Sequence, residues 1–239
     1  KEVDALVDVE QWMRIFAVRH IVGDWDGYGY DRGKNMSTYK PKDGKWKMIL
    51  WDLDFSLGGG SRGATASMFS TSDSTVRRLY ELPAFRRAYL RAWQDAIDGP
   101  LLDTESSPVI DAVYNAFRSN SVTASNPSSV KSWIRSRRNY LIRELARENA
   151  DFEITSNSGN EFSSSDNVVN LAGTAPVSVK NIRVNGIEYP IRWTSVKNWR
   201  IQVPLSERVN LLSVEGFDLR GEKVVEGADS IQVIFTGEE

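Results

Sequence analysis

The chain is 239 residues long, enough for one large domain or two ordinary ones, and its 30 basic and 32 acidic residues leave a net charge of −2. That balance gives no reason to expect a nucleic-acid partner. Cysteine is absent, which excludes disulfides, cysteine-ligated zinc and thiol catalysis, and no apolar run approaches the roughly 20 residues of a membrane-spanning helix.

Residues 9–22 (VEQWMRIFAVRHIV) place apolar side chains at helical spacing, and Gly23 follows as a stop signal. We therefore expect an amphipathic helix that leads into an acidic loop. The only histidine, His20, lies near the end of this helix, where packing or capping is a commoner role than catalysis. No serine, histidine and acid set can be assembled around it from the sequence.

Acids, an asparagine and glycines concentrate in residues 23–58. The apolar run Met48-Ile49-Leu50-Trp51 predicts a short buried strand that ends in Asp52-Leu53-Asp54. In a regular strand Asp52 and Asp54 would share a face, and paired carboxylates suit Mg²⁺, Mn²⁺ or Ca²⁺ better than zinc. Further oxygen ligands precede the strand, in a loop that glycines allow to bend tightly: Asp24, Asp26 and Asn35, with Gly23, Gly27, Gly29 and Gly33.

This segment resembles the CotH-like atypical protein kinases, a family named for spore coat protein H of bacteria. The resemblance rests on Asp24-Trp25-Asp26-Gly27-Tyr28, on Asn35 before an aromatic strand, on Gly44-Lys45-Trp46, and on Trp51-Asp52-Leu53-Asp54 with Gly58. It covers about residues 9–150. It implies that Asp26 is the catalytic-loop acid and that Asn35, Asp52 and Asp54 hold Mg²⁺ or Mn²⁺, with Asp52 the main ligand. ATP would be the phosphoryl donor and a serine or threonine hydroxyl of a protein the acceptor.

Three other interpretations of these acids stay open. Asp52-Leu53-Asp54 alone would satisfy the Asp-x-Asp pair of a nucleotide-sugar transferase, although such an enzyme needs a nucleotide-binding α/β half before the motif. Asp24, Asp26 and Gly29 occupy the first, third and sixth places of an EF-hand calcium loop, but Asn35 stands at the twelfth place, where a glutamate is required. In the third interpretation the carboxylates cap turns and helix starts without any metal.

Helical patterns follow the acidic segment. We expect helices over residues 76–82, from Pro83 onward, over residues 107–119 and over about residues 127–149. This succession matches the C-lobe of a kinase. Residues 59–75, rich in glycine, serine and threonine, lie where a kinase has its activation segment, and a solvated loop is the plainer interpretation.

Near residue 150 the pattern changes from helical to alternating. Residues 155–167 (TSNSGNEFSSSDN) have the composition of a domain boundary or an exposed loop. Short alternating runs then follow, and Asn185-Gly186 predicts a two-residue hairpin turn. We expect an immunoglobulin-like β-sandwich of about 85 residues, similar to modules appended to extracellular bacterial proteins. Trp193 and Trp199 could stack on a carbohydrate, although the core is the commoner place for them.

The predicted protein is therefore an α+β multidomain chain, with a kinase C-lobe-like domain over residues 1–150 and an all-β immunoglobulin-like sandwich over residues 151–239. We expect it at the surface of a bacterium or outside the cell, with any export signal upstream of residue 1. A kinase also needs a glycine-rich loop and a lysine from an N-lobe, so we expect this stretch to be inactive without that lobe. The alternative is a non-catalytic extracellular scaffold, or a carbohydrate-associated binding protein, with a degenerate kinase-like lobe.

Overall fold

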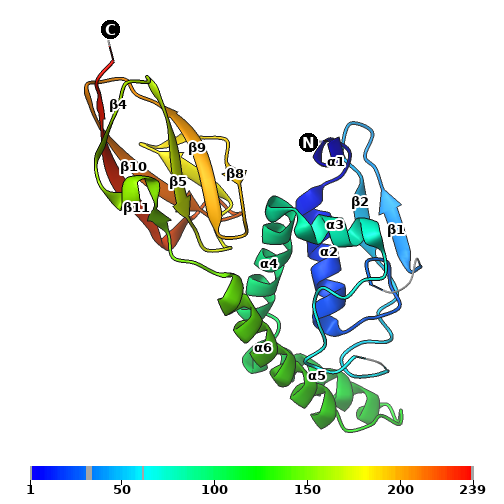
Figure 1. Ribbon diagram of the computed structural model, residues 1–239. Helices are drawn as coiled ribbons and strands as arrows, with labels where there is room; N and C mark the ends of the chain where they lie inside the picture. The colour runs from blue at the N-terminus through cyan, green and yellow to red at the C-terminus, as the bar shows by residue number, and fades with distance from the viewer. Residues whose placement is uncertain (1, 31–33, 61, 238–239) are drawn as a thin grey trace. The chain divides into compact units, whose positions relative to one another are not determined.

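The computed structural model describes residues 2–30, 34–60 and 62–237. The chain divides into two compact units, the first ending at Arg147 and the second beginning at Glu148 (Figure 1). We call the first unit the α lobe and the second the sandwich. Within the described ranges, no helix combines the length and the apolar character that a membrane crossing requires.

The α lobe is built from helices and one β-hairpin. Its elements are α1 (Glu2–Leu6), α2 (Val9–Val22), β1 (Met36–Tyr39), β2 (Lys47–Leu50), α3 (Ser74–Glu81), α4 (Pro83–Ile97), α5 (Asp103–Ser119) and α6 (Ser128–Glu148). The four helices expected after the acidic segment are present. One of them, α5, begins at Asp103 rather than at Ser107, because its first turn is polar and lacks the apolar spacing by which a helix is recognised.

Helix α2 is the central helix of the α lobe, and it packs along α4 (Figure 1). Asp8 caps its N-terminus by accepting a hydrogen bond from the backbone N–H of Gln11 at 3.2 Å, and Gly23 ends it in the left-handed conformation with φ of 78°. The predicted bounds of residues 9–22 are confirmed. Its apolar face joins a largely aromatic core with α3 and α4, formed by Met13, Phe16, Ala17, Val76, Tyr80, Tyr89, Leu90 and Trp93.

The hairpin of β1 and β2 corrects the expectation of a buried strand. The two strands pair antiparallel, with Met36 opposite Leu50, and only Met48 of β2 is buried. The side chain of Gln11 on α2 bonds to both the N–H and the C=O of Met48, so the edge of β2 lies against α2. The face of β2 with Lys47 and Ile49 is open, all of β1 is exposed, and Trp51, already outside the strand, is 63% exposed.

The segment after the acidic loop is tied down more firmly than its composition predicts. Of the described residues between 59 and 75, Met68 and Thr71 are buried. The buried Arg137 of α6 donates hydrogen bonds to the carbonyls of Ala64 and Ala66, at 3.0 and 2.8 Å. A solvated loop is therefore the wrong description for this part of the segment.

The sandwich consists of two sheets. Its elements are β3 (Glu153–Ile154), the 3₁₀ turn η1 (Ser156–Gly159), β4 (Phe162–Ser164), β5 (Val168–Thr174), β6 (Asn181–Val184), β7 (Ile187–Glu188), β8 (Arg192–Trp193), β9 (Asn198–Pro204), β10 (Val209–Phe217) and β11 (Lys223–Phe235). One sheet has the strand order β3-β5-β9-β8 and the other β4-β11-β10-β6-β7. This is the arrangement of an immunoglobulin-like sandwich, with the first strand divided between the two sheets.

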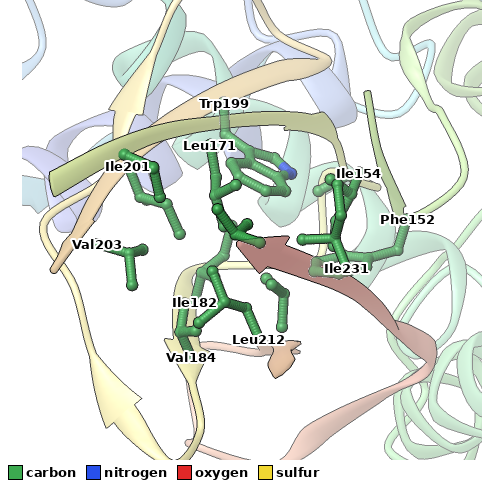
Figure 2. Packing of buried hydrophobic residues seen from close by; sticks show 14 of the residues in the cluster. Phe152, Ile154, Leu171, Ile182, Val184, Trp199, Ile201, Val203, Leu212 and Ile231 are labelled. Carbon is green, nitrogen blue, oxygen red and sulfur yellow. The ribbon is translucent and has the colours of Figure 1, made fainter. Parts of the chain in front are cut away.

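The inner faces of the two sheets form one apolar core, in which Trp199 is completely buried (Figure 2). Its indole N–H donates to the carbonyl of Thr174 at 2.9 Å, and Phe152 packs nearby. Gly173 makes room for the ring, because a Cβ at this position would lie 2.2 Å from the indole. Trp199 is therefore a core residue, and stacking of this ring on a carbohydrate is excluded.

Two local predictions for the sandwich have opposite outcomes. The turn at Asn185-Gly186 is confirmed: both residues have positive φ, and Val184 pairs with Ile187 across it. Most of residues 155–167 are exposed, as expected, but the segment is not a domain boundary, because it includes β4, whose residues pair parallel with β11, and Phe162 packs against the core. The polar composition of this segment predicted a loop, because composition does not show that backbone pairing holds the segment in the sheet.

Candidate functional site

The candidate site occupies the α lobe where the loop after α2 meets the two ends of the hairpin. Asp26, the predicted catalytic acid, is 3% exposed. Its Oδ1 accepts a hydrogen bond from Nδ2 of Asn35 at 3.0 Å, and its Oδ2 forms an ion pair with the Lys34 ammonium at 2.7 Å. The structure thus brings the predicted acid and one predicted metal ligand into direct contact.

The charge state of Asp26 follows from these contacts. Burial opposes ionisation, but the hydrogen bonds and charge of Lys34, together with the Asn35 amide, outweigh it and hold the pKa of Asp26 below its ordinary value. The carboxyl group is therefore ionised near neutral pH and can accept a hydrogen bond from a hydroxyl group.

Asp24 has a different environment from Asp26. It is fully buried, and one oxygen of its carboxylate accepts a hydrogen bond from the guanidinium of Arg19 on α2. Burial raises the pKa of Asp24 above its ordinary value, against the opposing effect of Arg19. Its Oδ1 has no hydrogen-bond partner among the described residues.

The same guanidinium joins the three segments that carry the candidate residues. Besides Asp24, Arg19 donates to the backbone carbonyl of Asn35 and to that of Trp51, the latter at 2.6 Å. Gly27 permits this approach, because a Cβ there would lie 1.9 Å from a nitrogen of Arg19. Neither Arg19 nor Lys34 was singled out from the sequence, since the acceptors of Arg19 are distant in the chain and Lys34 looks like any surface lysine.

Asp52 and Asp54 lie beyond the end of β2, which corrects the expectation that they share a face of a regular strand. Both are exposed. Asp52 adopts a left-handed conformation with φ of 56°, and Asn35, at the other end of the hairpin, has the same value. Such a conformation is uncommon for residues other than glycine, and it concentrates at functional sites.

Two glycines with positive φ allow the end of α2 and the loop after Asp54 to pack on Trp133 of α6. A Cβ at Gly23 would lie 3.0 Å from this ring, and one at Gly58 would lie 2.8 Å from it. The indole N–H of Trp133 donates to the carbonyl of Arg62 at 3.1 Å. Gly58, the last residue of the family-like motif, therefore has a packing role. Gly33, also expected to help the loop bend, lies outside the described residues.

His20 is a packing residue, one turn from the site. Its ring is buried against Tyr30 and Tyr89, and Nδ1 lies 2.5 Å from the Tyr89 hydroxyl. Burial, with the nearby charges of Arg137 and Arg62, lowers the pKa of His20 to about 3. The imidazole is therefore neutral at physiological pH.

The α lobe carries an acid (Asp26), an asparagine (Asn35) and two aspartates (Asp52 and Asp54) in and around its β-hairpin. An immunoglobulin-like domain follows it. This combination defines the class of protein. A family model described as "CotH kinase protein" matches residues 1–143. The chain belongs to the CotH kinase family.

Two other comparisons add little. No curated protein matches the sequence. A solved structure titled "Structures of Clostridium thermocellum CbhA fibronectin(III)-like modules" is 13% identical, with 37% of this chain and 99% of that chain covered and a TM-score of 0.28. The assignment of the sandwich rests on its own strand order.

The family implies a divalent metal and ATP, and the donor atoms of the site fit a hard cation. Asp52 and Asp54 offer exposed carboxylates, and because Asn35 turns its amide nitrogen to Asp26, its amide oxygen is the atom that could bind a metal. The described residues contain no group of three or more His, Cys, Asp or Glu side chains arranged for a metal. Mg²⁺ at phosphate-transfer sites commonly takes one or two carboxylates and completes its shell with phosphate and water.

Proposed function

We propose that this chain contributes the acid and the metal ligands of a kinase site that transfers the γ-phosphoryl group of ATP to a serine or threonine hydroxyl of a protein. The observation that carries the proposal is the hydrogen bond between Asn35 and Asp26. It joins two residues, nine apart in the sequence, to which the family resemblance assigns neighbouring roles. The ionised state of Asp26 and the left-handed conformations of Asn35 and Asp52 support it.

In this proposal Asp26 orients the acceptor hydroxyl and accepts its proton. Asn35 holds the carboxylate of Asp26 in place. Asp52, Asp54 and the Asn35 oxygen would hold Mg²⁺ or Mn²⁺, which neutralises phosphate charge when bound. Lys34, which is 59% exposed, is the side chain that would leave Asp26 when an acceptor enters.

The phosphate-covering loop, the location and the partner are proposed from the sequence and the family resemblance. Phosphoryl transfer also requires a loop that covers the phosphates and a lysine that contacts them, which the N-lobe of a kinase supplies. We propose that the activity belongs to the protein with both lobes, at a bacterial surface or outside the cell. A protein with serine or threonine acceptors would be its partner.

The test is phosphate incorporation from labelled ATP with Mg²⁺ or Mn²⁺ by the native protein with both lobes, followed by mass spectrometry of the modified residues. We expect Asp26→Asn and Asp52→Asn to abolish incorporation. Asp111→Asn is the matched control, because it changes an exposed aspartate that pairs with Lys131 between α5 and α6, away from the site. Incorporation that survives both site variants, or is absent from the native protein, would contradict the proposal and favour the scaffold alternative.

A further inference from the structure

We propose that Arg19 is a positioning residue that sets the spacing between the Asp26 loop and the Asp52 segment. The inference rests on the proposed function and assigns a role to a residue outside the family-like motif. Arg19 lies in the last turn of α2 and is 2% exposed. A buried arginine is costly unless its donors are satisfied. Both Nη atoms have acceptors, whereas Nε has no partner among the described residues, so the Nη contacts fix where the surrounding chain can lie.

Arg19 bonds to the backbone on both sides of the hairpin and does not bond to the side chains that are the candidate metal ligands. It donates to the backbone carbonyls of Asn35 and Trp51, not to the Asn35 or Asp52 side chains. Both ends of the hairpin are thereby anchored to one rigid helix, and Asp52 is the residue directly after an anchored carbonyl. The side-chain oxygens of Asn35 and Asp52 remain available for a cation.

Asp24 makes this arrangement compatible with a metal site. A lone buried guanidinium near a bound divalent cation would repel it, whereas the carboxylate of Asp24 neutralises Arg19 inside the lobe. Gly27 completes the arrangement by leaving space for the guanidinium.

Only arginine suits this role among the cationic side chains. Its planar guanidinium carries five donors in a fixed fork, so Nη1 can serve Asp24 while Nη2 serves the two carbonyls. The ammonium of a lysine is a single point with flexible direction, and it would not fix three acceptors at defined places. We therefore expect that Arg19→Lys keeps the charge but loses the positioning.

The test compares two double variants of the whole chain. Arg19→Gln/Asp24→Asn removes both charges together, so that no lone charge stays buried. Arg91→Gln/Glu10→Gln does the same to a second arginine and acid pair of the lobe, between α4 and α2, where Nη2 lies 2.5 Å from the carboxylate. Thermal unfolding is used to check that both double variants fold. If Arg19→Gln/Asp24→Asn does not fold, Arg19→Lys, which keeps the charge, replaces it.

Two measurements decide the outcome. Amide hydrogen exchange should accelerate at residues 24–30 and 51–53 in the Arg19 variants and stay unchanged there in the Arg91 control. Mn²⁺ affinity, measured by calorimetry with the metal alone, should fall by about tenfold or more in the Arg19 variants, as for other residues that orient metal ligands, and by less than about twofold in the control.

The two measurements also separate the positioning role from the proposed function. A parent chain that binds no Mn²⁺ would overturn the metal assignment, and exchange alone would then decide the role of Arg19. Unchanged exchange in the Arg19 variants, or an equal loss of Mn²⁺ affinity in the control, would overturn the positioning role.

Discussion

The interiors of the two units are built on different principles. Of the buried polar and charged residues described, eight lie in the α lobe and one, Asn210, lies in the sandwich. The eight are Arg19, His20, Asp24, Asp26, Thr71, Arg87, Arg91 and Arg137. The sandwich core is otherwise apolar and includes the buried ring of Trp199 (Figure 2).

Different interactions therefore hold each of the two units together. The sandwich depends on volume: strands alternate, apolar side chains fill the space between two sheets, and backbone pairing supplies the hydrogen bonds. The α lobe depends on buried cations that satisfy backbone carbonyls. Arg19 satisfies those of Asn35 and Trp51 at the candidate site, and Arg137 satisfies carbonyls at the end of α2 and in the segment after the acidic loop. We expect the first unit to respond to pH and to changes of charge, and the second to changes of volume.

The largest effect should come from removing volume in the sandwich. Trp199→Ala deletes a completely buried ring and should cost about 4 kcal/mol of the free energy of unfolding of this unit. Leu211→Ala, at a position that is 64% exposed, is the control and should cost little. Calorimetry of the whole chain should show one transition moved and the transition of the α lobe unchanged. A shift of both transitions would mean that the units do not unfold separately and would contradict the contrast between their interiors.

A somewhat smaller effect should come from removing a buried cation in the α lobe. Arg137 donates to the carbonyls of His20 and Ile21 at the end of α2, and to those of Ala64 and Ala66. Arg137→Met keeps most of the volume but leaves these buried acceptors unsatisfied, at a cost of about 3 kcal/mol.

Arg143→Met, an exposed position on the same helix, is the control for this variant and should change stability by less than about 0.5 kcal/mol. Urea unfolding followed by circular dichroism measures both variants. An equal effect of the two would show that volume and helix propensity, not the satisfied carbonyls, hold this part of the lobe.

The smallest of the three effects is a pH dependence confined to the α lobe. The pKa of His20 is about 3 in the folded chain, against 6.5 ordinarily, so the unfolded chain binds a proton that the folded chain does not. Stability from this group is complete above pH 6.5 and is lost progressively as the pH falls toward 3. At pH 5 the loss is about 2 kcal/mol.

His20→Gln removes the titration while keeping a polar side chain that can pair with the Tyr89 hydroxyl. The difference in stability between pH 7 and pH 5 should therefore be smaller in the variant by about 2 kcal/mol. Urea titrations at the two pH values measure this difference. Equal pH dependence in the variant and the parent chain would mean that His20 is not held neutral by the fold.

The sequence predicted what depends on short-range pattern. Helix α2 was predicted with its bounds, since apolar spacing and a terminal glycine are local signals. The turn at Asn185-Gly186 was predicted because both residues tolerate positive φ. Patterning failed where burial depends on what covers a segment, as for β2, which has one open face, and for β4, which is polar but paired.

The difference between what the sequence predicts and what the fold adds is largest at the candidate site. The two-part organisation, most of the elements and the residue types of the site could be predicted from the sequence, because composition, periodicity and motif are properties of neighbouring residues. The fold was needed to show that Asn35 bonds to Asp26, that Lys34 pairs with Asp26, and that Asp52 is exposed after the strand. It also revealed Arg19, whose three partners are separated by up to 32 residues from it along the chain. A hydrogen bond across that distance leaves no local pattern, since any residue offers the backbone carbonyl that accepts it.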